Sequence, residues 1–531
     1  MRGYKFIPLT TISIILSLTL GVYLWPLWTG DVFRLGNKSL ATRVPQEYFD
    51  LNDFLNQDSD FFRTLHLPIV AHGENYDWET GYIGSEPSLY ILDKPSISRW
   101  SWVPFCDELI KSLNRLVMSP GFEKILSLLN VKYIVLHKDI SKKARYLNTP
   151  SFYEKFLTYK IKPASPPLNT NRQKEILCLS RGGEIGGWQI LLGKSNFSEV
   201  GSSTEAFPSI RYLDTLSKEE LHFRYNVDPH MTDWSGMDFL RINLKINRPT
   251  PIKIDVCDKL HDSLVFWDGR YESIYSIHPY ETGQWKEFIL PLQSPSSFNK
   301  GDPRQVESFN LVIPVLDNPG EFQLDIGPVF LEKGEAYPNE FVRFRKKFDA
   351  LELYEVSEDL LLPHIYPVNH VVWFHDFNHF VDTLPEERFQ LKKELVLFES
   401  QKEEFPLLNT IPLPQEMFDL PTLGVKKINP THYKVDVKDA NAPFFLVFNE
   451  LYHPGWEGKI EDVLQPHFRG NIYGNVWYIR EKGNYTVELQ FLQQKSFEKY
   501  LKISSVFFIL FSIGILGYGL KSKMLKKSKS R

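Results

Sequence analysis

Hydrophobic and polar positions follow a strand-like pattern in three stretches near the C-terminal end of the chain. Residues 444–450 and 475–479 are rich in aromatic and branched side chains, and residues 485–491 alternate apolar with polar side chains. Because successive side chains of a strand point to opposite faces, this pattern predicts half-buried strands. The segment 482–484 centres on a glycine and predicts a tight turn between the last two strands. We expect a β-sandwich over residues 425–495.

Two longer apolar runs flank the rest of the chain. Residues 503–520 carry no charge over 18 positions, which is long enough for a transmembrane helix, and the tail 521–531 holds six basic residues and no acidic one. By the positive-inside rule the tail is cytoplasmic. Residues 7–29 form the second apolar run and predict an uncleaved transmembrane helix, with a cleaved signal peptide as the alternative. We expect a two-pass protein of the cell membrane with both termini cytoplasmic, an extracytoplasmic body and a membrane-proximal C-terminal sandwich.

Helical and strand-like periods alternate in the first part of the body. Apolar residues recur at helical spacing in 48–55, 107–117 and 122–129, and residues 130–140 form a continuous apolar run. Such a run is typical of a strand buried on both faces, so the order predicts an α/β domain over 31–160. The apolar segment 351–356 predicts a further strand of the same layer, continued over 339–400.

Residues 182–335 lack helical periodicity and read as a jelly roll. Short strand-like segments follow one another between turn residues, which is typical of a two-sheet sandwich. If the α/β layer resumes after them, the jelly roll is an insertion whose two ends lie close together. The predicted strands are 222–227, 239–246, 252–257, 271–278, 286–292, 308–314 and 321–331.

Composition fits a chain of mainly β fold with an α/β part. The 531 residues suggest about three domains, and 14% aromatic residues with 35 prolines favour sandwiches joined by loops. The predicted architecture is two β-sandwich or jelly-roll domains plus a discontinuous α/β domain, bracketed by two transmembrane helices. A net charge of -4 gives no reason to expect nucleic acid as a partner. The three cysteines, Cys106, Cys178 and Cys257, are best interpreted as small buried side chains.

Two resemblances to known families appear along the chain. The segments WSGMDFLRINLKI, IKIDVCD, GQWKEFILPL and GEFQLDIGPVFLEKG resemble jelly-roll carbohydrate-binding modules and related galactose-binding-like domains. The segments PLWTGDVFRL, VPQEYFDLNDFLN, LLNVKYIVLHKD, FDALELYEV, FFLVFNELYHPGWEG, GNIYGNVWYI and GNYTVELQF resemble the extracytoplasmic C-terminal half of GT-C type glycosyltransferases and YfhO-like membrane proteins. This chain departs from that family because it has only two predicted spans, too few to enclose a lipid-linked sugar. The resemblance therefore implies a glycan-related role, and catalysis by this chain alone is not expected.

Candidate sugar-binding residues lie in the predicted jelly roll. A pyranose is bound by aromatic faces flanked by polar groups, and the carbohydrate-binding candidates are Trp267, Tyr271 and Trp285, with Asp268 and Arg270 as hydrogen-bonding partners. Their spacing would allow several of them to share one sheet face or its rim. The alternative is that Trp285 and one of the other aromatic residues belong to the core.

No catalytic residue and no cofactor is predicted, and a single metal ligand is a candidate. The resemblance to carbohydrate-binding modules implies Asp325 as a ligand of a structural calcium ion, although one carboxylate is a weak basis for such a site. His364, His370, His375 and His379 cluster in sequence without the spacing of a metal motif. The second resemblance implies that His453 belongs to a structural corner.

Three functions remain open at this point. The first is a non-catalytic, membrane-anchored accessory in surface polysaccharide or glycoconjugate assembly, with a glycan, the lipid bilayer and a multi-spanning membrane glycosyltransferase as its partners. The second is a subunit or fragment of a GT-C glycosyltransferase that uses lipid-linked sugar. The third is a structural or adhesive surface protein that binds other proteins.

Overall fold

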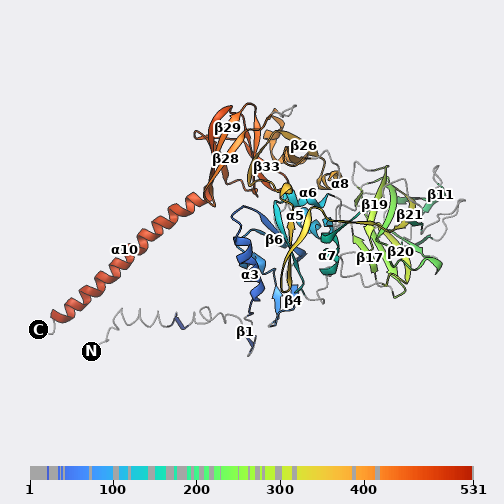
Figure 1. The fold of residues 1–531 in the computed structure, drawn as a ribbon, viewed down its shortest axis with the longest axis horizontal. Coiled ribbons are helices and arrows are strands. Elements are labelled where there is room, and N and C mark those ends of the chain that lie inside the picture. The colour runs from blue at the N-terminus through green and yellow to red at the C-terminus, as the bar shows by residue number, and fades with distance from the viewer. Residues whose placement is uncertain are drawn as a thin grey trace, which may run out of the picture.

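The structure is a computed structural model, and its ribbon is shown in Figure 1. The described residues are mainly β-sheet with some helices, which agrees with the predicted fold class. The ranges that the structure describes are 19, 21–22, 34–35, 38–39, 42–70, 74–79, 81–99, 107–117, 121–140, 150–162, 173–175, 188–192, 197–202, 208–214, 221–227, 229–248, 250–260, 263–268, 276–277, 282–292, 302–313, 320–384, 390–412 and 419–528.

A five-stranded sheet forms the centre of the α/β layer. Its strand order is β23 (Val342–Phe348), β24 (Leu351–Val356), β7 (Val131–His137), β3 (Arg63–Val70) and β6 (Ser96–Arg99). β3 runs parallel to both β6 and β7, whereas β24 is antiparallel to β7. Every residue of β7 is buried, as the continuous apolar run predicted, because side chains cover both faces of a central strand.

Helices cover both faces of this sheet. α3 buries Tyr48, Leu51 and Leu55, which lie along one side of the helix at spacings of three and four residues. α6 begins after Gly121, whose φ of +84° suits glycine and whose position leaves no room for a Cβ beside Leu384. The helices are α3 (Gln46–Asn56), α4 (Ser88–Ile91), α5 (Asp107–Leu116), α6 (Phe122–Leu128) and α7 (Pro150–Thr158).

A two-sheet sandwich follows the α/β layer in the chain. One sheet has the order β10-β13-β20-β16-β17 and the other β11-β12-β21-β14-β19, with β9 beside β21. Their inner faces share one core, which includes Phe223, Trp234, Phe288 and Phe309. The strands are β9 (Gln173–Glu175), β10 (Trp188–Leu192), β11 (Phe197–Ser202), β12 (Pro208–Asp214), β13 (Leu221–Asn226), β14 (Phe239–Ile246), β16 (Lys253–Asp258), β17 (Ser263–Asp268), β19 (Trp285–Pro291), β20 (Val306–Ile313) and β21 (Gly320–Glu332).

The sandwich leaves and rejoins the body through a pair of strands. β8 (Tyr159–Lys162) pairs antiparallel with β22 (Glu335–Pro338), and β23 and β24 then join the central sheet beside β7. The segment between β8 and β22 therefore begins and ends at the same place. A salt bridge of 3.0 Å between Lys155 of α7 and Asp238 adds a contact near this connection.

A second sandwich is built from the C-terminal strands. A four-stranded sheet has the order β25-β30-β34-β33 and a five-stranded sheet the order β28-β29-β35-β31-β32, and both contribute to one aromatic core. β34 and β35 belong to different sheets, so the predicted tight turn between them is wrong. Residues 480–482 instead carry the chain from one sheet to the facing sheet. The strands are β25 (Ile365–Val368), β28 (Thr422–Asn429), β29 (His432–Ala440), β30 (Phe444–Leu451), β31 (Trp456–Ile460), β32 (Val463–Leu464), β33 (His467–Gly470), β34 (Gly474–Ile479) and β35 (Gly483–Phe491).

Smaller elements fill the space between the central sheet and the second sandwich. β26 (His370–Phe374) and β27 (Glu394–Phe398) form a parallel pair, and α8 (Phe377–Thr383) and α9 (Gln401–Glu404) lie next to them in the chain. The remaining elements are β1 (Arg34–Leu35), β2 (Lys38–Ser39), β4 (Glu74–Tyr76), β5 (Tyr82–Gly84), β15 (Thr250–Pro251), β18 (Ser276–Ile277), η1 (Pro229–Met231), η4 (Glu358–Leu360) and η5 (Pro406–Asn409).

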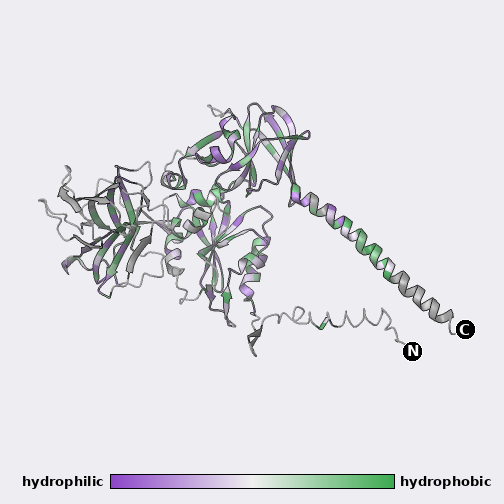
Figure 2. Ribbon diagram, turned by 180° about the vertical axis from the view of Figure 1, so that it is seen from behind, coloured by the Kyte–Doolittle hydropathy of each residue, from purple (hydrophilic) through white to green (hydrophobic). Residues whose placement is uncertain are grey.

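The last strand continues directly into a long helix. α10 (Leu492–Ser528) projects from the second sandwich, and hydrophobic residues follow its polar first turns (Figure 2). Phe507, Phe508 and Phe511 are each more than two-thirds exposed. Among the residues that the structure describes, no helix is at once long and apolar enough to cross a membrane. The predicted span at 503–520 is therefore not confirmed, and the predicted span at 7–29 lies almost wholly outside the described residues.

Candidate functional site

The outer face of the six-stranded sheet carries a row of one aromatic and two charged side chains. Asp325 of β21 pairs with Lys245 of β14, and Lys245 pairs with Trp285 of β19, so the three residues lie side by side across three strands. The neighbours Leu244, Leu324 and Ile326 belong to the core. Because side chains alternate along a strand, the row points away from that core.

Trp285 lies across the sheet rather than standing upright from it. Its side chain is 37% exposed, and Lys245 Nζ lies 5.8 Å from the ring centroid. A Cβ at Gly327 would lie 3.2 Å from Trp285 Cζ3 and 3.0 Å from Asn243 Cβ. Glycine at this position therefore lets the indole lie against the sheet.

A buried charge network occupies the same face further along β14. Arg241 donates from Nε and Nη2 to Glu332 Oε2 at 2.9 and 2.8 Å, and its Nη1 lies 2.5 Å from Glu287 Oε2. Burial alone would lower the pKa of Arg241, but the hydrogen bonds and charges of the two carboxylates outweigh it and raise the pKa. The guanidinium is thus fixed as a cation, and it holds Glu287 on the same edge strand as Trp285.

Asp325, the predicted calcium ligand, is buried and accepts hydrogen bonds from Gln323. Gln323 Nε2 lies 3.1 and 3.2 Å from its two carboxylate oxygens. Asp325 is not part of any convergent group of three or more metal-binding side chains among the described residues. The calcium site stays a prediction, whereas the position of Asp325 in the same row as Trp285 is a finding.

The other predicted sugar-binding residues lie in a different part of the sandwich. Trp267 and Asp268 are at the end of β17, an edge strand of the five-stranded sheet, so Trp267 and Trp285 do not share a sheet face. Their side chains, and the whole of Arg270 and Tyr271, lie outside the described residues. These assignments stay predictions.

The histidines noted in the sequence do not form a common site. His364 stacks on Phe61 with ring centroids 3.5 Å apart, and its Nε2 lies 3.1 Å from Glu450 Oε1. His370, His375 and His379 belong to or adjoin β26 and α8, where His370 and His375 each lie near a glutamate.

His453 lies in a structural corner, as predicted. Its Nδ1 accepts a hydrogen bond of 2.9 Å from the Gly455 backbone amide, and its carbonyl accepts one of 3.0 Å from the amide of Trp456. Trp456 is buried beneath the corner, with its ring centroid 4.9 Å from that of Phe448. The turn therefore fixes a core residue of the second sandwich.

A second site, which sequence reasoning missed, lies in the α/β layer. His66 of β3 and His137 of β7 are on neighbouring parallel strands, and both side chains are fully buried. His66 Nδ1 lies 2.9 Å from His137 Nε2. The parallel register brings the two imidazoles together near the carboxyl ends of the strands, where α/β sheets commonly place their ligands.

A buried glutamate completes this histidine cluster. Glu86, in the segment between β5 and α4, places Oε1 3.6 Å from His137 Nε2. Ser88 Oγ donates to the same oxygen at 2.7 Å, and Tyr76 Oη donates to Oε2 at 2.8 Å. The carboxylate is therefore held facing the imidazoles.

Asp139 supports the cluster from the other side. Its Oδ1 lies 3.3 Å from His137 Nδ1, and its Oδ2 accepts hydrogen bonds from Tyr48 Oη at 2.7 Å and Trp78 Nε1 at 2.8 Å. Burial by itself would lower the pKa of His137, but Glu86 and Asp139 outweigh it and raise the pKa. Burial, together with the charge of His137, lowers the pKa of His66 well below its usual value, so His66 is neutral.

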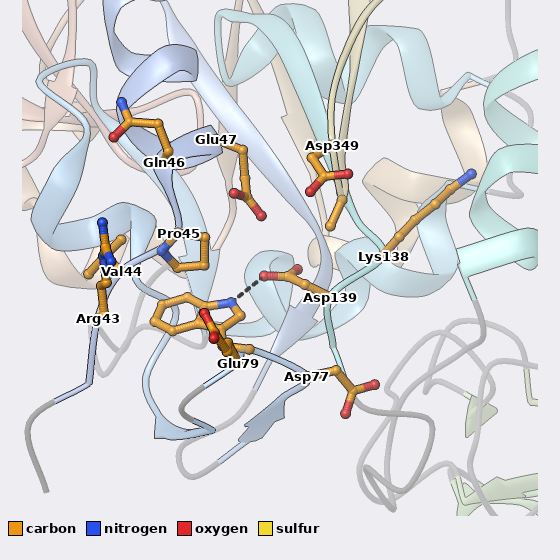
Figure 3. Close-up of a pocket in the computed structure, with 12 residues that line it drawn as sticks. Arg43, Val44, Pro45, Gln46, Glu47, Asp77, Glu79, Lys138, Asp139 and Asp349 are labelled. Carbon is orange, nitrogen blue, oxygen red and sulfur yellow. Dashed lines mark hydrogen bonds between the residues drawn. The ribbon is translucent and has the colours of Figure 1, made fainter.

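An acidic pocket of about 470 Å³ adjoins the cluster (Figure 3). Glu47, Asp139 and Asp349 are among its lining residues, and burial followed by the charges of Asp349 and Asp139 raises the pKa of Glu47. Lys138 extends away from the pocket, with Nζ 2.6 Å from Glu352 Oε1. Asp139 and Trp78 belong to both the pocket wall and the support of the cluster, so the two sites are adjacent.

The sequence held one signal for the histidine cluster. In FFRTLHLPI and NVKYIVLHKD a histidine stands within a segment that is otherwise read as a buried strand. Charged or polar groups are seldom fully buried without partners, so a histidine in each of two buried strands indicates a shared polar site. Neither segment by itself shows that the strands are neighbours.

No protein-family description matches the chain, and no curated protein matches it. Among solved structures, a family 11 carbohydrate-binding module from Clostridium thermocellum, in complex with a beta-1,3-1,4-mixed-linked tetrasaccharide, is 15% identical. The match covers 30% of this chain and 95% of that one, with a TM-score of 0.21. A family 30 carbohydrate-binding module is 13% identical over 32% of this chain and 91% of that one, with a TM-score of 0.23.

A longer structural match includes most of the chain. Arabinofuranosyltransferase AftD from Mycobacteria is 8% identical, and the match covers 92% of this chain and 66% of that one with a TM-score of 0.35. The neighbours thus include carbohydrate-binding modules and a glycosyltransferase, whereas the YfhO-like part of the sequence resemblance stays a prediction. At TM-scores below 0.5 none of these likenesses decides the function of this chain.

Proposed function

We propose that this protein binds glycans on the outer face of its six-stranded sheet. The observation that carries the proposal is the row of Trp285, Lys245 and Asp325, in which a partly exposed indole lies beside a cation and a carboxylate. A pyranose has an apolar face that stacks on an aromatic ring and hydroxyl groups that need donors and acceptors nearby. Trp285 and Lys245 offer the ring and a donor side by side, and the exposed carboxylate of Glu287, on the same strand as Trp285, adds an acceptor.

The surrounding charges suit a neutral or hydroxyl-rich ligand better than an anion. Arg241 is neutralised by Glu287 and Glu332, so the positive charge on this part of the face is already paired. Glu287 is 40% exposed and can accept hydrogen bonds from hydroxyl groups. Among the described strands β19 is at the edge of this sheet, so a chain of sugars could extend past Trp285 on that side.

We further propose that the protein acts as a non-catalytic, membrane-anchored extracytoplasmic accessory in surface polysaccharide or glycoconjugate assembly. The exposed aromatic and aliphatic side chains of α10 support an anchoring role, since water-exposed apolar surface of this extent indicates a lipid or protein contact. A multi-spanning glycosyltransferase is the proposed partner.

The direct test is a glycan array followed by calorimetric titration on the purified full-length chain. Covering one face of a tryptophan removes on the order of 100 Å² from water, which contributes about 2 kcal/mol. Trp285→Ala is therefore expected to weaken glycan binding by at least about tenfold. Binding that is unchanged in this variant would reject the sheet face as the site.

A matched control is available elsewhere in the chain. Trp373 of β26 also lies under a lysine, with Lys402 Nζ 4.3 Å from its ring centroid, but it belongs to a different sheet. Trp373→Ala should leave glycan affinity unchanged. Circular dichroism of both variants separates a lost contact from a lost fold.

A further inference from the structure

We propose that His66, Glu86 and His137 form a binding site for one zinc ion. One ligand atom of each residue lies within 4.8 Å of the other two, and all three side chains are buried. Among the residues that the structure describes, this is the one group of three or more histidine, cysteine, aspartate or glutamate side chains that converges in this way. The site is separate from the residues proposed to bind glycan.

The spacing of the donor atoms fits a tetrahedral zinc ion. Zinc binds nitrogen and oxygen at about 2.0–2.1 Å, so two ligand atoms of a tetrahedral site lie roughly 3.3 Å apart. The distance from His66 Nδ1 to His137 Nε2 is 2.9 Å, and that from His137 Nε2 to Glu86 Oε1 is 3.6 Å. One of these distances is slightly shorter and the other slightly longer than the expected value of roughly 3.3 Å, so a small rotation of the side chains is enough to accommodate the ion.

The ring nitrogens that face away from the centre are held by other side chains. His137 Nδ1 is near Asp139 Oδ1 at 3.3 Å, and His66 Nε2 is near Thr64 Oγ1 at 3.0 Å. Metal-binding histidines usually contact a carboxylate or another acceptor through the second nitrogen, which fixes the tautomer and aims the free lone pair at the metal. Asp139 is itself fixed by Tyr48 and Trp78, so its orientation does not depend on the metal.

The donor set selects the kind of ion. Two imidazoles and one carboxylate suit zinc or a similar transition metal, whereas calcium and magnesium prefer oxygen ligands alone. Ser88 Oγ lies 3.1 Å from His66 Nδ1 and 2.7 Å from Glu86 Oε1, so it lies where a fourth ligand, either this hydroxyl or a water molecule, would be. The negative charge of the carboxylates offsets the charge of the ion inside the protein.

The location of the ligands indicates a structural role. His66 and His137 come from β3 and β7, and Glu86 comes from the segment between β5 and α4. Zinc would therefore join this segment to the central sheet. Because all three ligand side chains are buried, the ion would be shielded from bulk solvent, and its proposed role is structural.

The test begins with the full-length chain freed of metal by a chelator. Adding zinc should restore one equivalent per chain by mass spectrometry of the metal and raise the melting temperature, because a ligand that binds the folded state stabilises it. Cobalt in place of zinc should give the visible absorption bands of a tetrahedral nitrogen and oxygen site. A folded chain that binds neither metal at this stoichiometry, and whose melting temperature is unchanged by zinc, would overturn the proposal.

Variants then locate the ion. His66→Gln and His137→Gln should abolish stoichiometric zinc binding, and Asp139→Asn should weaken it by about 10–100-fold because it acts through His137. His364→Gln, at a half-buried histidine that contacts a glutamate, is the matched control and should keep the metal. Zinc retained by the first two variants would place it elsewhere, and Trp285→Ala should bind zinc normally even if glycan binding fails.

Discussion

At the scale of single residues, the charge state of a buried polar group depends on whether nearby opposite charges offset its loss of contact with water. Arg241 and Asp139 are buried and are kept charged by partners of opposite sign, whereas burial lowers the pKa of His66 and keeps it neutral. The difference arises because desolvation penalises the charged form unless a nearby opposite charge outweighs it. Removing one partner from such a network therefore costs more than the network itself contributes.

His467 provides a pH-dependent test at this scale. Burial, only partly opposed by its hydrogen bond to Asn475, lowers the pKa of His467 to about 4, below the ordinary value of 6.5. Between pH 6.5 and pH 4 the imidazole of His467 is protonated in the unfolded chain but stays neutral in the folded chain. The free energy of unfolding therefore falls as the pH is lowered from 6.5 towards 4. Between pH 7 and pH 5 this residue should account for a loss of about 2 kcal/mol.

Urea unfolding at the two pH values measures that loss. In His467→Gln the decrease in the free energy of unfolding between pH 7 and pH 5 should be smaller by about the same 2 kcal/mol. His379→Gln, at an exposed histidine of α8, should leave the decrease as it is in the unmodified chain. An equal pH dependence in all three proteins would show that His467 titrates normally.

At the scale of elements, a single tyrosine joins the α/β layer to the C-terminal sandwich. Tyr473 lies just before β34, and its hydroxyl donates a hydrogen bond of 2.8 Å to the Leu128 carbonyl at the end of α6. The oxygen of this hydroxyl accepts a hydrogen bond of 3.0 Å from Arg63 Nη1 of β3. Arg63 in turn contacts the backbone carbonyl of Asn449 in β30. Three elements that are distant in sequence thus meet at one hydroxyl group.

Tyr473→Phe removes this junction while keeping the ring. Because a buried carbonyl and a guanidinium lose a partner, the free energy of unfolding should fall by about 1–3 kcal/mol. Tyr485→Phe removes a half-buried hydroxyl that contacts only a nearby backbone carbonyl, that of Glu481, and should cost less. Chemical denaturation of both variants checks the order, and an equal loss in the two would contradict the junction.

At the scale of the whole molecule, the hydrophobic cores divide the chain into parts that unfold differently. One large cluster includes Leu67 and Leu136 of the central sheet together with Phe445 and Tyr478 of the C-terminal sandwich. The inserted sandwich has a core of its own, which includes Leu244. Residues that share a core lose their contacts together, so the two parts should melt as separate cooperative units.

Scanning calorimetry is expected to show at least two transitions. Leu244→Ala should lower only the transition of the inserted sandwich, and Leu136→Ala should lower only that of the body, each by the roughly 2–5 kcal/mol typical of a buried leucine. Both leucines are fully buried, so the pair is matched in size and environment. A single transition that both variants shift equally would show one cooperative unit instead.

Local patterns predicted those elements whose burial follows from their own sequence. β7 is a continuous apolar run and is buried throughout, and β35 alternates because it has one covered face. The pairing of β34 and β35 with different sheets depends on strands far away in the chain, so the local turn signal was misleading. Likewise, the meeting of His66 with His137 depends on a parallel register that no single segment contains.

The paired strands β8 and β22 have a consequence for how such a protein can arise. They place residues 162 and 335 opposite each other, so the path of the body is the same whether a few residues or a complete sandwich connects them. A gene segment that encodes the sandwich can therefore be gained, exchanged or lost in one event without rerouting the rest of the chain. Relatives of this protein with the same body and a different inserted domain, or with a short turn in place of the sandwich, are the expected products of such exchange.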